Sequence, residues 1–232
     1  FFTGDRWIIM NITILKGLQG AKQAKGLTVI IDVFRASTTI LAALHQGAEH
    51  IIPIESIQEA LSFKKQNPSC ILVGERNGKH LSGFDYDNSP ATIMSLNLNK
   101  KSIVLSTSSG TKGICNAHQS SETLIAGFAN ISKMISYIKN KNTKHLTLIP
   151  MGLNATNPAI EDDLCADLIK KRLQNQSVTY HEFIEPIMRC LGIKRLQNLK
   201  QQKDISYCLT KDSIPIISSY DKNKGKIVPI SY

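Results

Sequence analysis

Acidic, basic and hydroxyl side chains gather in four short segments, 32–39, 74–78, 106–111 and 151–163. Each segment ends a run of apolar residues with the length of a buried strand, or opens the helical pattern that follows it. Ligands of open parallel sheets bind beyond the carboxyl ends of the strands, where loops and helix N-termini converge. We therefore expect functional side chains in these four segments first.

Asp32 interrupts an apolar run, Thr28 to Val33, that would otherwise be fully buried. A buried carboxylate is costly unless a cation or hydrogen-bond donors compensate it. Arg35 is a candidate partner, so a simple Asp32–Arg35 pair that ties strand to helix is one interpretation. The other is that Asp32 holds a metal ion or belongs to a phosphate site.

The segment from Ser106 to Thr111 is rich in hydroxyl groups. Amides and hydroxyls at the start of a helix can bind an anion, which makes Ser108, Ser109, Gly110 and Thr111 candidate phosphate ligands. Capping of an ordinary helix is the alternative. The segment is not a Walker loop, because the GxxxxGK[ST] spacing is absent.

Further carboxylates could bind a cation. Glu75 and Arg76 precede an Asn-Gly turn and can face the cleft, although a plain surface turn is the alternative. Asp85 lies in a loop with Asp87 and Asn88, and such oxygen ligands suit Mg²⁺, but the same residues also suit the start of a helix.

Acidic residues also open the helix expected over 158–173. There Glu161 and Asp162 are alternative ligands, since acids favour the first turn of a helix regardless of function.

Other hydrolase sites are absent from the sequence. The histidines occur singly, without HExxH, and Cys190 with Arg195 falls one residue short of a cysteine phosphatase loop. Phe34 stands where an aspartyl-phosphate phosphatase would carry its second aspartate. These absences leave metal-assisted attack by water.

Strands and helices are expected to alternate along the first three quarters of the chain. The expected strands are 28–33, 50–54, 70–73, 102–105, 123–126 and 145–149, and the helices between and after them are 36–46, 56–66, a short one after Ser89-Pro90, 111–118, 130–140 and 158–173. Alternation implies crossover connections and a mainly parallel sheet covered on both faces. The fold class is therefore α/β, with a three-layer α/β/α core over residues 11–174.

The last section breaks this alternation. A helix near 180–190 and short strands at 205–209, 214–218 and 226–230 predict an appended α+β section, residues 175–232, packed on the core as part of a single globular unit. From Arg189 to Lys226 there are nine Lys or Arg against three Asp, part of a net charge of +10. No nucleic-acid motif accompanies them, so we interpret them as a solvated surface and expect no nucleic-acid partner.

Composition excludes several classes of protein. Of 232 residues, 42 % are apolar and 20 % charged, which excludes disorder of the whole chain. No apolar run suits a membrane span or a signal peptide, and five scattered cysteines without a CxxC pair favour reduced thiols. We expect a cytoplasmic protein without a membrane partner. Residues 1–9 precede a natural start at Met10, and we treat them as upstream sequence.

Six segments together resemble the 2-phosphosulfolactate phosphatase family, in order and spacing, from about Ile12 to Leu173. They are Val29–Thr39, Gly47-Ala48, Val73–Gly78, Gly83–Asp85 with Asn88–Pro90, Thr107–Thr111 and Glu161–Ala166. The resemblance implies an α/β/α hydrolase that uses Mg²⁺ to remove phosphate from 2-phosphosulfolactate, on the route to coenzyme M. A related 2-phospho-hydroxyacid is the alternative substrate.

On this basis we expect the metal and the substrate at the four segments. Asp32 and Glu75, with Asp162 or Asp85, would hold Mg²⁺, and Asp32, Arg35 and Glu75 would be catalytic. The substrate, a small anionic phosphomonoester, would be bound by Arg35, Arg76, Lys79, Ser108, Ser109, Gly110 and Thr111. A non-catalytic binding protein for a phosphorylated or sulfonated acid is the alternative function. The sequence allows a homodimer without fixing the oligomeric state.

Overall fold

The computed structural model describes residues 10–232, so residues 1–9, treated above as upstream sequence, lie outside it. The first half contains β1 (Asn11–Ile14), α1 (Gly17–Gln23), β2 (Gly26–Ile31), α2 (Ala36–His45), β3 (His50–Pro53), α3 (Ile57–Gln66), β4 (Ile71–Arg76), β5 (Lys79–His80), α4 (Pro90–Ile93), β6 (Ser102–Ser106) and α5 (Gly110–Asn116). The second half contains β7 (Ser120–Ala126), a 3₁₀ turn η1 (Phe128–Asn130), α6 (Ile131–Asn140), β8 (His145–Pro150), α7 (Ile160–Leu173), α8 (His181–Ile187), α9 (Leu191–Asn198), α10 (Gln202–Leu209), β9 (Ile217–Asp221) and β10 (Lys226–Ile230).

The described strands form one mixed, mostly parallel sheet, in the order β1-β8-β2-β7-β9-β10-β3-β6-β4-β5. Strands β1, β8, β2 and β7 are parallel neighbours, and so are β3, β6 and β4. The antiparallel hairpin β9–β10 lies between these two groups and pairs with β7 on one side and β3 on the other. The C-terminal section therefore supplies the middle of the sheet.

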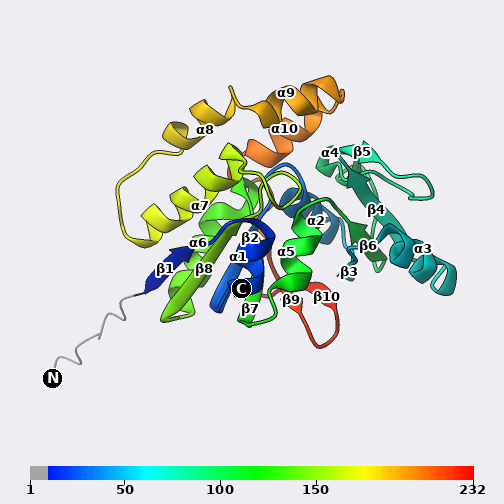
Figure 1. The fold of residues 1–232 in the computed structure, drawn as a ribbon, viewed down its shortest axis with the longest axis horizontal. Coiled ribbons are helices and arrows are strands. Elements are labelled where there is room, and N and C mark those ends of the chain that lie inside the picture. The colour runs from blue at the N-terminus through cyan, green and yellow to red at the C-terminus, as the bar shows by residue number, and fades with distance from the viewer. Residues whose placement is uncertain (1–9) are drawn as a thin grey trace.

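Helices cover both faces of this sheet, as Figure 1 shows. Side chains alternate along β2, so Val29 and Ile31 pack with α6, α7 and the C-terminal helices, while Ile30 packs on the other face with α1, α2 and α5. A smaller cluster places α3 over β4 and β6, where Leu72 and Val104 are buried. The predicted three-layer α/β/α class is confirmed.

Local signals in the sequence match the structure at several element ends. Ser56 caps α3 by accepting a hydrogen bond from the Glu59 amide, and Ser89 caps α4 in the same way through Thr92. Gly47 ends α2 with φ of +91°. Strand β1 and helix α1 were not predicted. None of the described helices is both long and apolar enough to cross a bilayer.

The C-terminal section differs from the prediction in several elements. Residues 205–209, expected as a strand, belong to helix α10, because Ile205, Cys208 and Leu209 pack on the core at helical spacing. The strand expected at 214–218 begins at Ile217, whereas β10 matches the predicted 226–230. Helix α9 follows the expected helix near 180–190 and was not predicted.

Candidate functional site

A cavity of about 660 Å³ lies where the ends of β2, β4 and β8 meet the first turn of α7. Residues of the core line the cavity with acids and hydroxyls. Helix α9 and the loop before that helix form the part of the wall contributed by the C-terminal section. Asp32 and Glu75, which come from opposite sides of the β9–β10 hairpin, both line this cavity. The lining residues used below are Asp32, Arg35, Glu75, Asn88, Ser108, Ser109, Glu161, Asp162, Arg189 and Arg195.

Asp32 follows the last residue of β2 and is buried. Its Oδ1 accepts a long hydrogen bond from Ala36 N (3.4 Å), and its own amide donates to Ser37 Oγ (3.0 Å). Burial, then the charge of Glu75, raises the pKa of Asp32 to about 6. The carboxyl group therefore keeps its proton to a higher pH than an ordinary aspartic acid does.

Glu75 joins two loops of the site. Its Oε1 accepts from Ser108 N (2.7 Å), and its Oε2 accepts from Gly78 N (2.6 Å) and Ser108 Oγ (3.1 Å). The buried carboxylate is thus held between the β4–β5 turn and the loop after β6. Both the amide and the hydroxyl of Ser108 are used to orient Glu75.

Asp162 and Glu161, left as alternatives by the sequence, both line the cavity. Asp162 accepts from Val33 N (2.7 Å) and Gly152 N (2.8 Å), which ties α7 to the ends of β2 and β8. Burial, with the charges of Asp32 and Glu161, raises the pKa of Asp162 well above its ordinary range. Burial also raises the pKa of Glu161, whose Oε2 lies 3.5 Å from the Cys190 thiol.

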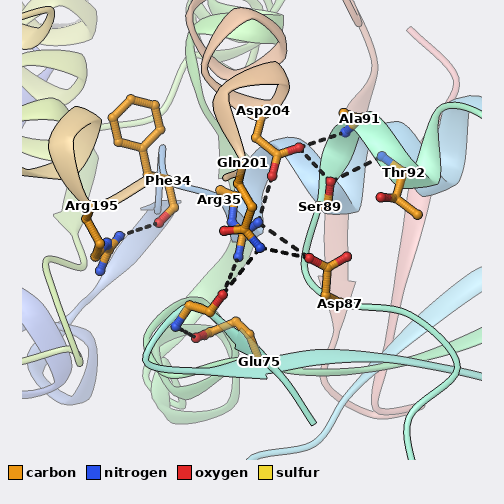
Figure 2. A network of polar contacts seen from close by, with 11 residues as sticks. Phe34, Arg35, Glu75, Asp87, Ser89, Ala91, Thr92, Arg195, Gln201 and Asp204 are labelled. Carbon is orange, nitrogen blue, oxygen red and sulfur yellow. Dashed lines mark hydrogen bonds and ion pairs between the residues drawn. The ribbon is translucent and has the colours of Figure 1, made fainter. Parts of the chain in front are cut away.

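Arg35 pairs with a residue that the sequence did not indicate. Its Nη1 lies 2.6 Å from Asp204 Oδ2 and 3.8 Å from Asp87 Oδ2, and its Nη2 donates to Gly78 O. Asp204 also accepts from Ser89 Oγ (2.6 Å) through Oδ1, as Figure 2 shows. The Asp32–Arg35 pair that the sequence left open is therefore replaced by an Arg35–Asp204 pair, which joins α10 to the β2–α2 junction.

Five of the predicted site residues do not line the cavity, namely Arg76, Lys79, Asp85, Gly110 and Thr111. Arg76 donates to Glu55 O (2.6 Å), Glu75 O (2.7 Å) and Ser106 O (3.1 Å), so its guanidinium holds three parts of the backbone together. Asp85 Oδ2 accepts from Leu72 N (2.7 Å) and Lys64 Nζ (3.1 Å). Lys79 is likewise outside the lining. Their positions give no support for the substrate-binding and metal-binding roles expected of them.

The loop after β6 contributes unequally to the cavity. Ser109 lines it, but its hydroxyl donates to Gly152 O (2.7 Å) and accepts from Ala155 N (3.0 Å). Thr111 is fully buried and bonds to Thr107. A Cβ on Gly110 would lie 3.0 Å from Asp32 Oδ2, so the backbone passes directly beside that carboxylate. Of the loop residues, Ser108 holds an acid of the site, whereas the hydroxyls of Ser109 and Thr111 bond to the backbone and to Thr107.

Sequence reasoning missed Asp204 and Arg195. Both lie on helices, α10 and α9, that were predicted as a strand or not predicted, within a section interpreted as a charged surface. Arg195 lines the cavity, its Nη2 donates to Phe34 O (3.3 Å), and its buried Nε has no hydrogen-bond partner among the described residues. The helical spacing of Ile193 and Leu196, which are buried beside it, is the signal that could have placed it.

The donor set suits a hard divalent cation. Five acids, Asp163 included, line the cavity, and three of them, Asp32, Glu161 and Asp162, have a pKa raised chiefly by burial. Asn88 Oδ1 is buried there without a partner. Within residues 10–232, no three acidic, histidine or cysteine side chains converge closely enough to bind a metal by themselves. Mg²⁺ commonly needs one or two carboxylates, with water and substrate oxygens completing its shell.

Comparisons with known proteins give the family of this chain. A family model described as 2-phosphosulpholactate phosphatase matches residues 13–223, which includes α9 and α10. A probable 2-phosphosulfolactate phosphatase of Thermotoga petrophila is 34 % identical over 79 % of this chain and 84 % of its own length. One of Carboxydothermus hydrogenoformans is 32 % identical over 94 % of this chain and 97 % of its own length. The chain therefore belongs to the 2-phosphosulfolactate phosphatase family of phosphoric monoester hydrolases.

Proposed function

We propose that this protein is a Mg²⁺-dependent phosphatase that hydrolyses 2-phosphosulfolactate or a related 2-phospho-hydroxyacid to the 2-hydroxyacid and phosphate. The observation that carries the proposal is the meeting of Asp32 and Glu75 at one cavity, although their strands belong to separate groups of the sheet. Membership of the family supports the reaction class and the substrate.

The hydrogen bonds of the acids distinguish the one that would bind the metal directly from those that would bind it through water. Asp32 accepts a long bond, 3.4 Å, whereas Glu75 and Asp162 accept bonds of 2.6 to 2.8 Å from backbone amides. We assign Asp32 as the direct ligand and Glu75 and Asp162 as ligands through water. Mg²⁺ supplies polarisation of the phosphoryl oxygens and a lower pKa for bound water.

The chain's own groups prepare the reaction. Hydrogen bonds from four separate backbone segments fix Glu75 and Asp162, so the negative potential around Asp32 is in place before substrate binds. Cationic Arg195, with Arg35 deeper in the wall, offsets that potential where the anionic ester must enter.

Released phosphate tests the proposal. The protein is incubated with 2-phosphosulfolactate, 2-phospholactate or isopropyl phosphate, with Mg²⁺ or with EDTA. We expect turnover of the first two esters with Mg²⁺, slower but measurable turnover of isopropyl phosphate, and loss of all three activities in EDTA. Binding of 2-phosphosulfolactate without phosphate release would contradict the proposal and favour the binding-protein alternative. The coenzyme M route, the cytoplasmic location and the oligomeric state stay predictions.

A further inference from the structure

Three arginines line the cavity, and two of them already have carboxylate partners. Arg35 is paired with Asp204 at 2.6 Å and approaches Asp87 at 3.8 Å. Arg189 is exposed and paired with Glu185 at 3.0 Å. A guanidinium in a close ion pair has less charge left for a ligand. In the described part of the chain, Arg195 is the cavity arginine that makes no such pair.

The surroundings of Arg195 favour binding of an anion. Its Nε is buried without a hydrogen-bond partner, which is costly unless a ligand supplies one. A Cβ on Gly192, three residues before Arg195 on α9, would lie 2.6 Å from Glu161 Oε1, so this part of the helix passes directly beside the acids of the cavity. Arg195 therefore lies close to the acids. In the view of Figure 2 its head group is bonded to the Phe34 carbonyl, apart from the Arg35 network.

The charges of the substrate and the cavity indicate which group Arg195 meets. A 2-phospho-hydroxyacid with a sulfonate carries the phosphate and two further acidic groups. The phosphoryl group belongs at Asp32, where the proposed function places the cation. The remaining acidic groups would face a wall to which the core contributes five carboxylates and, among the lining residues, one cation, Arg35, which is already paired with Asp204, so they need a cation from elsewhere. Helix α9 supplies that cation from the C-terminal section.

Resting on the proposed function, we propose that Arg195 binds an acidic group of the substrate other than the phosphate, a carboxylate or a sulfonate, and so determines specificity for phosphorylated acids over simple phosphate esters. The planar guanidinium offers a fork of donors that matches two oxygens of either group. Arg195 takes no part in the transfer of the phosphoryl group, so its contribution belongs to KM.

The test compares three variants on two esters, 2-phosphosulfolactate and isopropyl phosphate, which has the phosphate but no second acid. For Arg195→Gln we expect KM for 2-phosphosulfolactate to rise about 10- to 100-fold with kcat within about threefold, and kcat/KM for isopropyl phosphate to be unchanged. Arg195→Lys keeps the charge but not the fork, so an intermediate loss is expected. Arg189→Gln, the matched control, removes an exposed and paired arginine of the same cavity wall and should leave both esters unaffected.

Equal losses on both esters, or no loss on either, would overturn the proposal, because Arg195 would then act on the acids of the site or not at all. A second measurement tests the role of Arg195 even if the proposed function is wrong. If the wild-type protein releases no phosphate, calorimetric titration with 2-phosphosulfolactate still measures the ester's affinity for wild type and Arg195→Gln. A loss of affinity in the variant supports the role of Arg195, and equal affinities overturn it.

Discussion

Arg35 and Asp204 form a buried ion pair, Nη1 to Oδ2 2.6 Å, across 169 positions of the sequence. Both side chains are almost fully buried, at 2 % and 1 % exposure. Asp204 also accepts from Ser89 Oγ and from Ala91 N, so one carboxylate connects α10, α4 and the β2–α2 junction. The arrangement makes Asp204 a structural support for the cavity wall.

Asp204→Ala should be strongly destabilising. Removing one partner of a buried pair leaves the other charge uncompensated, at a cost of about 3 to 5 kcal/mol, and we expect Tm to fall by roughly 10 °C. The matched control is Asp167→Ala, which removes a half-exposed pair with Lys171 on α7 and should cost less than about 1 kcal/mol. Equal losses of Tm in the two variants would show that the buried Arg35–Asp204 pair stabilises the fold no more than the half-exposed pair does.

In the absence of Mg²⁺, the Asp32→Asn variant should be more stable than wild type, by an amount that depends on pH. Burial raises the folded-state pKa of Asp32 from 3.8 to about 6, so the folded protein holds a proton that the unfolded chain has released. Stability of the wild type therefore falls as pH rises from 3.8 to about 6. The asparagine variant does not titrate, and above that window it should gain up to about 3 kcal/mol relative to wild type.

Thermal unfolding in EDTA at pH 4 and pH 7.5 measures this effect. We expect a small difference in Tm between the two proteins at pH 4 and a higher Tm for Asp32→Asn at pH 7.5. Added Mg²⁺ should raise Tm of the wild type and not of the variant. A variant that is less stable at pH 7.5 would instead identify Asp32 as a structural hydrogen-bond acceptor.

Asp162→Asn and Asp85→Asn should separate the two acids that the sequence offered as alternatives for the metal. Asp162 lines the cavity and Asp85 does not. For Asp162→Asn we expect the Mg²⁺ concentration at half-maximal phosphate release to rise about 10- to 100-fold, as for other residues that orient a metal site. Asp85→Asn should stay within about twofold of wild type. The reverse order would return Asp85 to the metal site.

Gly110→Ala should reduce phosphate release by displacing Asp32. The added Cβ would lie 2.6 Å from Ala36 Cβ and 3.0 Å from Asp32 Oδ2, so the start of α2 or the carboxylate must move. We expect kcat to fall at least tenfold, because small displacements of positioned groups are costly for catalysis. Gly127→Ala is the control, since its Cβ would meet atoms no closer than 3.7 Å. Similar activities for the two variants would show that Asp32 tolerates the shift.

The sequence was sufficient to bring Asp32 and Glu75 together, because each lies at the carboxyl end of a strand in a parallel sheet. It could not place Arg76 correctly, since neighbouring residues on a strand point to opposite sides and the segment 74–78 was treated as a unit. The packing of β4 against the rest of the molecule decides which of the two side chains, Glu75 or Arg76, points toward the cavity.

Long-range pairing could not be predicted. Nothing near Arg35 in the sequence indicates Asp204, and the alternating residues 205–209 resemble a strand until the surface that buries them is known. The strand order was also inaccessible, because the hairpin β9–β10 inserts between β7 and β3, two strands that lie much earlier in the chain. The local spacing of apolar residues predicts most helices and strands, whereas the positions of α10 and of the hairpin β9–β10 depend on tertiary contacts.

The hairpin β9–β10 has a consequence for biosynthesis. Strands β7 and β3 are complete by residue 126, yet the partners that join them, β9 and β10, are translated after residue 216. While the ribosome is still making the intervening helices, β7 and β3 each leave an unpaired edge on their own group of parallel strands. Such an edge can associate with other nascent chains. We therefore expect the two sides of the catalytic pocket to meet only after translation has passed residue 230.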